Sequence, residues 1–182
     1  MNKNEILTAA RNMLNERTES LKKDCEHCLF KDHPAPFPAL LYCFSVIDLL
    51  GSLYAGDAKS SSGITKRALD YMINMMSYPK EKAELLQKVF RHKIVHLAQP
   101  NPKTKHNGRV YLWWLCHEKD YEKHFIVNSI KKSKELIFQI SVASLVDDIA
   151  NSVFRPNGYL HRLEMEPDLQ SNFQTAYKQI FS

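Results

Sequence analysis

The chain has 182 residues, 44% of them apolar, which suits one domain with a real hydrophobic core and excludes a disordered chain. We therefore expect a single domain over residues 1–182. Its formal net charge of +5 favours polyanionic partners such as nucleic acid, although many ordinary enzymes are equally basic. No apolar stretch typical of a secretory signal begins the chain, and four cysteines are too few for a disulfide scaffold, so we expect a cytoplasmic protein.

The first half of the sequence predicts four helices. Apolar residues recur at helical spacing over Asn4–Leu21 and Ile64–Met76, whereas Ala39–Tyr54 is apolar on all sides, as in a helix surrounded by others. Three prolines between Pro34 and Pro38 predict a loop before that central helix. A fourth helix begins at Pro79 and must end before Pro100.

The central apolar segment contains one carboxylate, Asp48. Phe37–Ala55 is long enough to be weighed as a membrane span, but Asp48 would cost about 2.5–3.5 kcal/mol in the bilayer. We interpret the segment as a buried helix and expect no membrane partner. Buried Asp48 needs a donor or a cation, for which a structural bond to a neighbouring helix is favoured over an orienting contact to Arg91 or a histidine.

The second half begins with a hairpin pattern and then continues as helix. Asn107-Gly108, followed by β-branched and aromatic residues, predicts a small β-hairpin insertion near residues 103–116. A long helix is expected over Phe125–Phe154, with Lys131 and Lys132 near its start, and a last helix over Pro167–Phe181. The predicted fold class is therefore all-α, a helical bundle with this small hairpin.

Three aromatic residues of the hairpin could stack nucleic-acid bases: Tyr111, Trp113 and Trp114. Alternation along a strand sends Trp113 and Trp114 to opposite faces. We therefore expect at least one of them to pack on the bundle instead.

Chemistry-bearing residues gather on the fourth helix. On a helical wheel of about 100° per residue, Leu86, Phe90, Ile94 and Leu97 form one side. The opposite arc holds polar residues and one apolar residue, namely Glu84, Lys88, Arg91, His92, Val95 and His96. An apolar Val95 in a polar arc indicates a covered surface, such as a helix-to-helix dimer contact. A solvated face of an amphipathic helix is the simpler interpretation of the same pattern.

The segment from Phe90 to Leu97 resembles the Arg-x4-6-His signature of the HEPN superfamily, with His92 in the polar place after Arg91. The resemblance covers about Ala39 to Pro100, with the expected long helix as a further member of the fold. It implies an HEPN-like helical bundle that forms a homodimer, with the motif helices facing each other across a shared cleft. His92 departs from the asparagine or aspartate more often expected beside the arginine.

Many proteins of this superfamily are metal-independent ribonucleases, so the resemblance implies an endoribonuclease that cleaves single-stranded RNA without a cofactor. His96 would move protons, Arg91 would hold the phosphate, and His92 would complete the catalytic set. Lys88, Lys131 and Lys132 are the expected substrate-binding cations. RNA, a second copy of the chain and an inhibitory protein are the expected partners.

Other interpretations remain open. Other members of the superfamily are non-catalytic modules that bind protein or nucleic acid. His92 and His96 could hold a metal from successive helical turns, although no glutamate lies between them as in hydrolytic zinc motifs. Cys25 and Cys28, with His33, have the spacing of half a zinc site, and ordinary reduced cysteines are the favoured interpretation.

Overall fold

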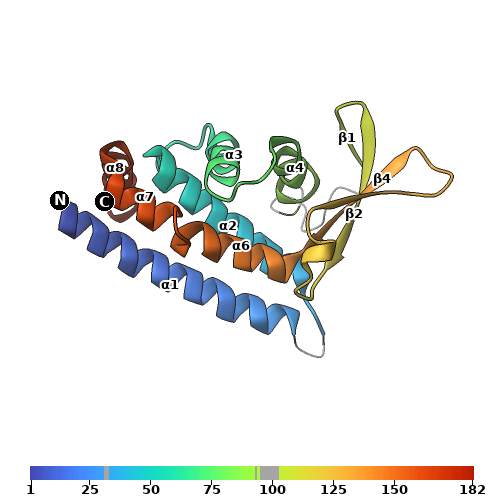
Figure 1. Ribbon diagram of the computed structural model, residues 1–182, viewed down its shortest axis with the longest axis horizontal. Coiled ribbons are helices and arrows are strands. Elements are labelled where there is room, and N and C mark those ends of the chain that lie inside the picture. Colours follow the sequence, from blue (N-terminus) through green and yellow to red (C-terminus); the bar gives the residue numbers. More distant parts are fainter. Residues whose placement is uncertain (31–32, 93, 95–102) are drawn as a thin grey trace. The chain divides into compact units, whose positions relative to one another are not determined.

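The computed structural model describes residues 1–30, 33–92, 94 and 103–182 (Figure 1). These residues form two compact units, one comprising residues 1–21, 45–78 and 148–182 and the other comprising residues 22–44 and 79–147. Three helices continue from one unit into the other: α1 (Lys3–Leu29), α2 (Pro36–Ala55) and α6 (Val142–Phe154). The expectation of one domain over the whole chain stays a prediction.

The first unit is built from helices around a buried tyrosine. Three helices lie entirely within it: α3 (Ile64–Asn74), α7 (Tyr159–Met165) and α8 (Pro167–Phe181). Tyr71 of α3 is fully buried, its hydroxyl lies 2.9 Å from Ser152 Oγ, and its ring lies 6.2 Å from that of Tyr159. A Cβ at Gly51 would lie 2.8 Å from the backbone of Arg67 and Ala68, so this glycine allows α2 and α3 to approach closely.

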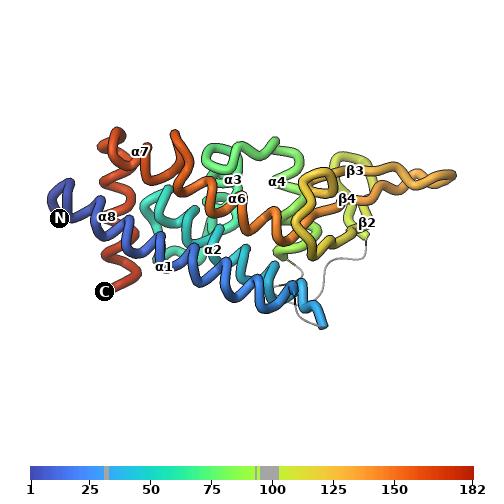
Figure 2. The backbone as a smooth tube through the Cα atoms, turned by 60° about the horizontal axis from the view of Figure 1, so that its bottom comes forward, coloured from blue at the N-terminus to red at the C-terminus, as the bar shows by residue number. Residues whose placement is uncertain are grey.

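The second unit contains a four-stranded mixed sheet in the order β1-β2-β4-β3. Its strands are β1 (Thr104–His106), β2 (Arg109–Cys116), β3 (Ile126–Ser129) and β4 (Glu135–Ser141). The pairs β1/β2 and β3/β4 are antiparallel, whereas β2 and β4 run parallel over seven residue pairs. Figure 2 shows the turn between β3 and β4 extending beyond the strands.

One face of this sheet packs against the motif helix. That helix begins as α4 (Lys80–Leu86) and continues as a π-helical turn, η1 (Gln87–Arg91). The ring of Phe90 is fully buried and lies 6.3 Å from Trp113 of β2 and 6.0 Å from Phe138 of β4. Phe37 of α2 adds an edge contact to Trp113 at 5.9 Å. Aromatic packing therefore holds η1 on the sheet.

The predicted all-α fold class is wrong, because the mixed sheet makes this a mostly helical α/β protein. The hairpin near residues 103–116 is present as β1 and β2, with Asn107 and Gly108 at φ values of 48° and 74° in the turn. Positive φ at both turn residues is the conformation that an Asn-Gly dipeptide favours. The hairpin is one half of a larger sheet.

The error lies in the expected long helix over Phe125–Phe154, whose first half forms β3 and β4. Leu136, Phe138 and Ile140 recur at every second position of β4, which is a strand pattern. The apolar residues of this segment are also compatible with helical spacing, so the local pattern does not decide between the two. Pairing with β2, which is distant in sequence, decides the conformation. The helix α6 begins after Ser141, whose Oγ accepts a hydrogen bond from Ser144 N–H at 3.1 Å.

Other boundaries also differ from expectation. The first helix extends to Leu29, and α2 begins at Pro36 because proline is tolerated in a first helical turn. The expected long helix does end at Phe154, as α6, and the short helix α7 that follows was not expected. The predicted last helix is confirmed as α8.

Among the described helices, α2 alone has the length and composition that could cross a membrane. Half of its apolar window is buried inside the protein. This burial fits the interpretation of a core helix, although Asp48 itself is only half-buried.

The two adjacent tryptophans provide a test of the sheet's orientation. Trp113→Ala removes ring contacts to Phe37 and Phe90, so it should lower the free energy of unfolding by roughly 2–4 kcal/mol. Trp114 is 59% exposed, so Trp114→Ala should change that free energy by no more than about 0.5 kcal/mol. Urea unfolding followed by circular dichroism measures both. Equal losses of stability would contradict the orientation of β2.

Candidate functional site

The motif helix changes its geometry where the motif begins. Gln87–Arg91 form a π-helical turn, which ends with His92 N–H donating to Gln87 O, five residues earlier. Such turns are rare and occur often at functional sites. A wheel drawn for an α-helix does not hold across this turn. Lys88 and His92 are nevertheless exposed, as the wheel predicts, and Arg91 is half-buried.

A buried histidine from β1 contacts this helix. His106, whose side chain is 1% exposed, has Nδ1 2.9 Å from Lys88 Nζ. An ammonium group can only donate, so Nδ1 must accept and the neutral ring carries its proton on Nε2. Nε2 lies 3.5 Å from Glu84 Oε2, which is close enough for electrostatic attraction although it lacks hydrogen-bond geometry. His106 thereby joins an exposed lysine to a half-buried carboxylate.

Three buried side chains of this helix and strand have polar atoms without a hydrogen-bond partner among the described residues. They are Gln87 at both amide atoms, Thr104 at Oγ1 and His106 at Nε2. Gln87 begins the π turn, and Thr104 and His106 share one face of β1. Buried polar groups without partners are uncommon, and they often mark a site for water, an ion or a ligand. We call Glu84, Gln87, Lys88, Arg91 and His106 the polar helix face.

Sequence reasoning identified Glu84, Lys88 and Arg91 as members of one polar arc and missed Gln87 and His106. His106 lies within the predicted hairpin but was not singled out as a site residue, although alternation in β1 buries both Thr104 and His106. That alternation was a usable signal. Gln87 could not be found from the wheel, because its position depends on the packing of the π turn.

Of the remaining predicted site residues, the structure describes Asp48, Lys131 and Lys132. Val95 and His96 are outside the described residues, so their positions stay predictions. Asp48 lies in the first unit, where it lines a hollow of about 380 Å³ together with Ser60 and Arg67. The Arg67 guanidinium donates to Asp57 Oδ2 and to the carbonyl of Ser60, so it organises the serine-rich loop.

The expected substrate-binding lysines Lys131 and Lys132 are in the second unit but are not on a helix. Both are exposed in the turn between β3 and β4, where Lys132 adopts a φ of 62°. Their expected place at the start of a long helix was therefore wrong. They remain candidates for contact with a polyanion.

The cysteines support the interpretation of reduced, structural thiols. Cys25 is buried and lies 3.7 Å from the Ala39 carbonyl oxygen, so it faces the interior. Burial and then a hydrogen bond with Cys25 raise the pKa of the Cys43 thiol, which favours its unreactive protonated form. Among the described residues, no group of three or more histidine, cysteine or acidic side chains could hold a metal ion.

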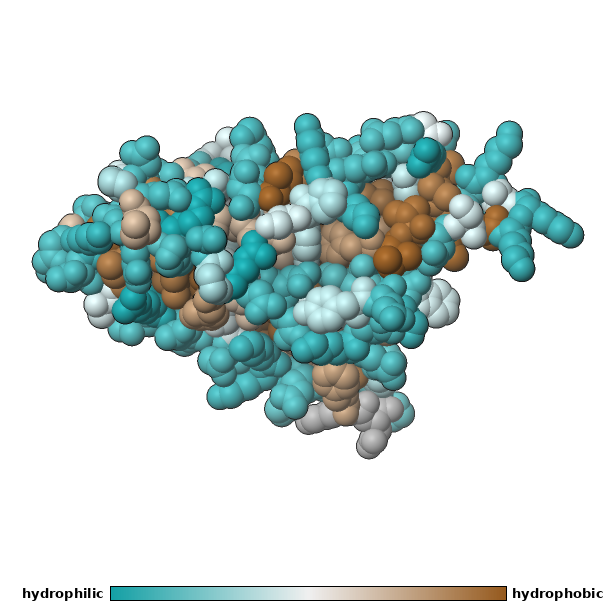
Figure 3. All heavy atoms as spheres, in the orientation of Figure 1, coloured by the Kyte–Doolittle hydropathy of each residue, from teal (hydrophilic) through white to brown (hydrophobic). Residues whose placement is uncertain are grey.

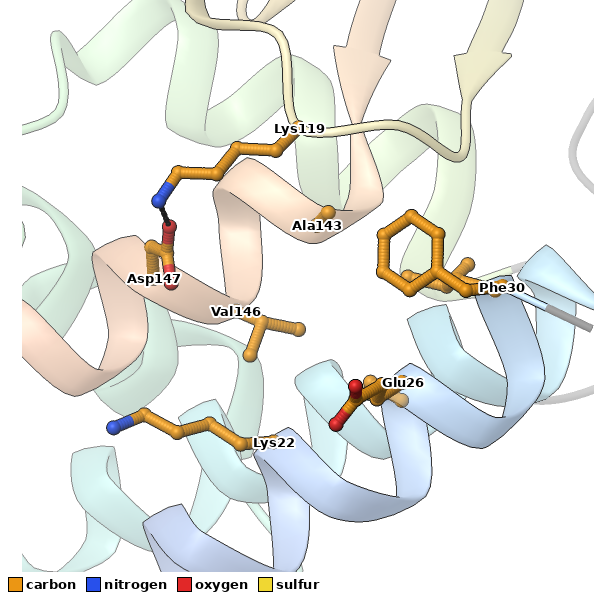
Figure 4. A pocket seen from close by; sticks show the side chains of 9 residues that line it. Lys22, Glu26, Phe30, Lys119, Ala143, Val146 and Asp147 are labelled. Carbon is orange, nitrogen blue, oxygen red and sulfur yellow. Dashed lines mark ion pairs between the residues drawn. The ribbon is translucent and has the colours of Figure 1, made fainter.

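A separate groove lies in the second unit. It has a volume of about 190 Å³, and Figure 4 shows Lys22 and Glu26 of α1, with Phe30 just after that helix, opposite Ala143 and Val146 of α6. At its side, Lys119 Nζ pairs with Asp147 Oδ2 at 2.5 Å, and this hydrogen bond raises the pKa of Lys119. The lining is mostly apolar and this lysine is already paired, so the groove offers little for acid–base chemistry.

The comparisons with known proteins return no match: no family model fits the chain, and no curated protein or solved structure is similar to it.

Gln87 provides a test of whether the polar helix face is built for stability. Gln87→Met should raise the free energy of unfolding by about 1 kcal/mol, because a buried amide without partners is costly. Gln170 is the matched control. Its Nε2 donates to Leu163 O at 2.8 Å, so Gln170→Met should lower the same free energy by about 1 kcal/mol. Destabilisation by Gln87→Met in urea unfolding would contradict the prediction.

Proposed function

We propose that the chain is a metal-independent endoribonuclease that cleaves single-stranded RNA at the polar helix face. The observation that supports this most is the joining of Lys88 to buried His106 beside Arg91 on a π turn. Two cations, Lys88 and Arg91, thereby lie on one short helical segment next to exposed His92. Phosphoryl chemistry needs this combination of positive charge and proton transfer.

The reaction uses the substrate's own 2′-hydroxyl as nucleophile. That oxygen loses its proton to a base and bonds to the adjacent phosphorus, while the 5′-oxygen leaves and takes a proton from an acid. The products are a 2′,3′-cyclic phosphate and a 5′-hydroxyl. In the proposed roles, His96 transfers protons, Arg91 binds two phosphate oxygens, and His92 assists at the same face.

Lys88 has a supporting role in this mechanism. Its ammonium donates to His106 Nδ1, and the carboxylate of Glu84 lies on the other side of the ring. His106 and Glu84 are therefore positioning residues that hold Lys88 near Arg91. A held ammonium loses less side-chain freedom when a phosphate binds than a mobile one would.

We further propose a homodimer in which the two motif helices face each other and each site uses residues of both copies. An inhibitory protein that covers the polar helix face belongs to the same proposal, since an unrestrained ribonuclease would damage its own cell. Four cysteines without disulfides suit a cytoplasmic setting, where thiols stay reduced.

Cleavage assays with oligonucleotides test the chemistry. His96→Ala should reduce the rate by about 10²–10⁴-fold, the usual loss when acid–base help is removed. Arg91→Lys should also be severe, because a point charge cannot replace a planar fork on two phosphate oxygens. Activity should persist in EDTA, and DNA, which lacks the 2′-hydroxyl, should not be cleaved. His161→Ala, which removes an exposed histidine of the first unit, is the matched control and should be fully active.

Mass spectrometry of the cleaved ends distinguishes the possible mechanisms. Ends with 2′,3′-cyclic phosphate support attack by the 2′-hydroxyl, whereas 5′-phosphate ends or full activity of His96→Ala would refute it. Loss of activity in EDTA would favour a metal site at His92 and His96. No cleavage across varied RNAs would favour a non-catalytic binding module.

The dimer is tested by Val95→Glu, which would force two like charges into an apolar contact. Sedimentation at micromolar concentration should show a dimer for the wild type and a monomer for the variant. A monomeric wild type would remove the shared site. An unchanged dimer in Val95→Glu would place the contact elsewhere.

A further inference from the structure

The sheet of the second unit has a second face that does not carry the Phe90 contact. Trp113 and Phe138 point toward the motif helix, so alternation turns Leu112, Trp114 and Ile137 to the opposite side. Trp114 is 59% exposed there, beside half-buried Leu112 and Ile137. Figure 3 shows hydrophobic surface over the strand region, bordered by hydrophilic side chains. We call Leu112, Trp114 and Ile137 the outer sheet face.

Parallel pairing of β2 and β4 brings two turns to one end of the sheet. Val110 pairs with Glu135 at the beginning of both strands, so the β1–β2 and β3–β4 turns are neighbours. Five exposed cations belong to this end, and the structure describes no ion pair for them among residues 1–30, 33–92, 94 and 103–182. They are Lys105, Arg109, Lys131, Lys132 and Lys134. Lys103 is also present but is paired with Glu135 at 2.6 Å.

The formal net charge of the chain is located in the two hairpins, β1–β2 and β3–β4. Residues 103–116 and 126–141 contain six of the 25 lysines and arginines but only one of the 20 acidic residues. They therefore carry a formal charge of +5, equal to that of the chain, and the remaining residues sum to zero. A positive concentration of this kind favours a polyanion.

We propose that the outer sheet face and its basic end bind single-stranded RNA, with Trp114 stacking on one base and the turn cations contacting phosphates. At about 3.3 Å per residue, Trp114 lies about 13 Å along β2 from Val110, a separation that a few nucleotides span. Exposed aromatic side chains beside cations are the usual means of binding single strands without sequence preference. The identification of RNA rests on the proposed ribonuclease function.

Geometry connects this surface with the polar helix face. β1 is the edge strand, and its successive residues alternate between the two sides of the sheet. His106 faces the motif helix, whereas Lys105 is exposed on the other side. A single-stranded RNA bound at Arg91 can therefore pass over the edge strand β1 and reach Trp114. The outer sheet face would hold the part of the substrate that is not being cleaved.

Binding of an uncleavable RNA tests the proposal separately from catalysis. The probe is a fluorescently labelled 2′-O-methyl oligouridylate of about twelve nucleotides, whose blocked hydroxyl cannot attack. Trp114→Ala should raise Kd about 10-fold, as expected for loss of one stacked base, and Trp114→Phe should restore most of the affinity. Removing a cation with Lys131→Gln or Lys132→Gln should lower the slope of log Kd against log salt by about 0.7 per phosphate contact.

Two variants in the first unit are the controls. Met165→Ala removes a side chain that is 72% exposed, and Lys178→Gln removes an exposed cation. Neither should change Kd or its salt dependence. Circular dichroism establishes that each variant is folded, and RNA should quench the tryptophan fluorescence of the wild-type protein more than that of Trp114→Ala, which retains only Trp113.

The outcomes separate this proposal from the catalytic one. Trp114-dependent binding by a protein that cleaves no RNA would support the RNA surface and refute the ribonuclease. Cleavage of unmodified RNA with equal probe affinity in wild type and Trp114→Ala would overturn the RNA surface alone. No binding by the wild type would also overturn it. Loss of self-association in Trp114→Ala, with unchanged RNA affinity, would overturn it by assigning this face to a second copy of the chain.

Discussion

The packing of Phe90 between Trp113 and Phe138 is the contact on which the second unit depends. Phe90 belongs to the π turn, and its two ring neighbours belong to the paired central strands β2 and β4. Because side chains on a helix have a fixed angular relation, burying Phe90 in this position also determines where Lys88 and Arg91 can lie. The π turn has more residues per turn than an α-helix, so it changes the angle between these side chains. In this geometry Lys88 contacts His106 on the edge strand. The apolar core and the polar helix face are thus two consequences of one docking contact.

Burial of polar groups separates the polar helix face from an ordinary solvated helix surface. A surface lysine gains little from a nearby carboxylate, since water screens the pair. His106 is instead almost completely buried, and Gln87, which precedes Lys88, and Thr104, on the same face of β1, are buried without described hydrogen-bond partners. Such groups reduce stability unless something satisfies them. Keeping such groups at the helix that carries Arg91 therefore has a cost in stability, of the kind that functional sites commonly impose on a fold.

The sheet adds a distribution of charge that no local segment has. Each hairpin is moderately basic by itself, but parallel pairing of β2 with β4 puts both turns at the same end. The two strands also align Trp114 with half-buried aliphatic neighbours on the face opposite the motif helix. One pairing therefore accounts for the core face under Phe90, the outer sheet face and the basic end. An all-helical arrangement of residues 125–154 would have dispersed these features.

Local chemistry in the sequence determined the features that depend on near neighbours. The central apolar helix, the last helix, the Asn107-Gly108 hairpin and the opposite orientations of Trp113 and Trp114 follow from period, turn chemistry and strand alternation. The grouping of Lys88 with Arg91 follows in the same way. Tertiary structure decided the rest. Residues 126–141 have spacings compatible with helix or strand, and hydrogen bonding to β2, which lies far away in sequence, selects the strand. His106 contacts Lys88 only because β1 lies against the motif helix, and the π turn forms where Phe90 meets the sheet. Interactions between residues distant in sequence leave no local periodicity, which is why the fold class and the contact between Lys88 and His106 could be known only from the folded chain.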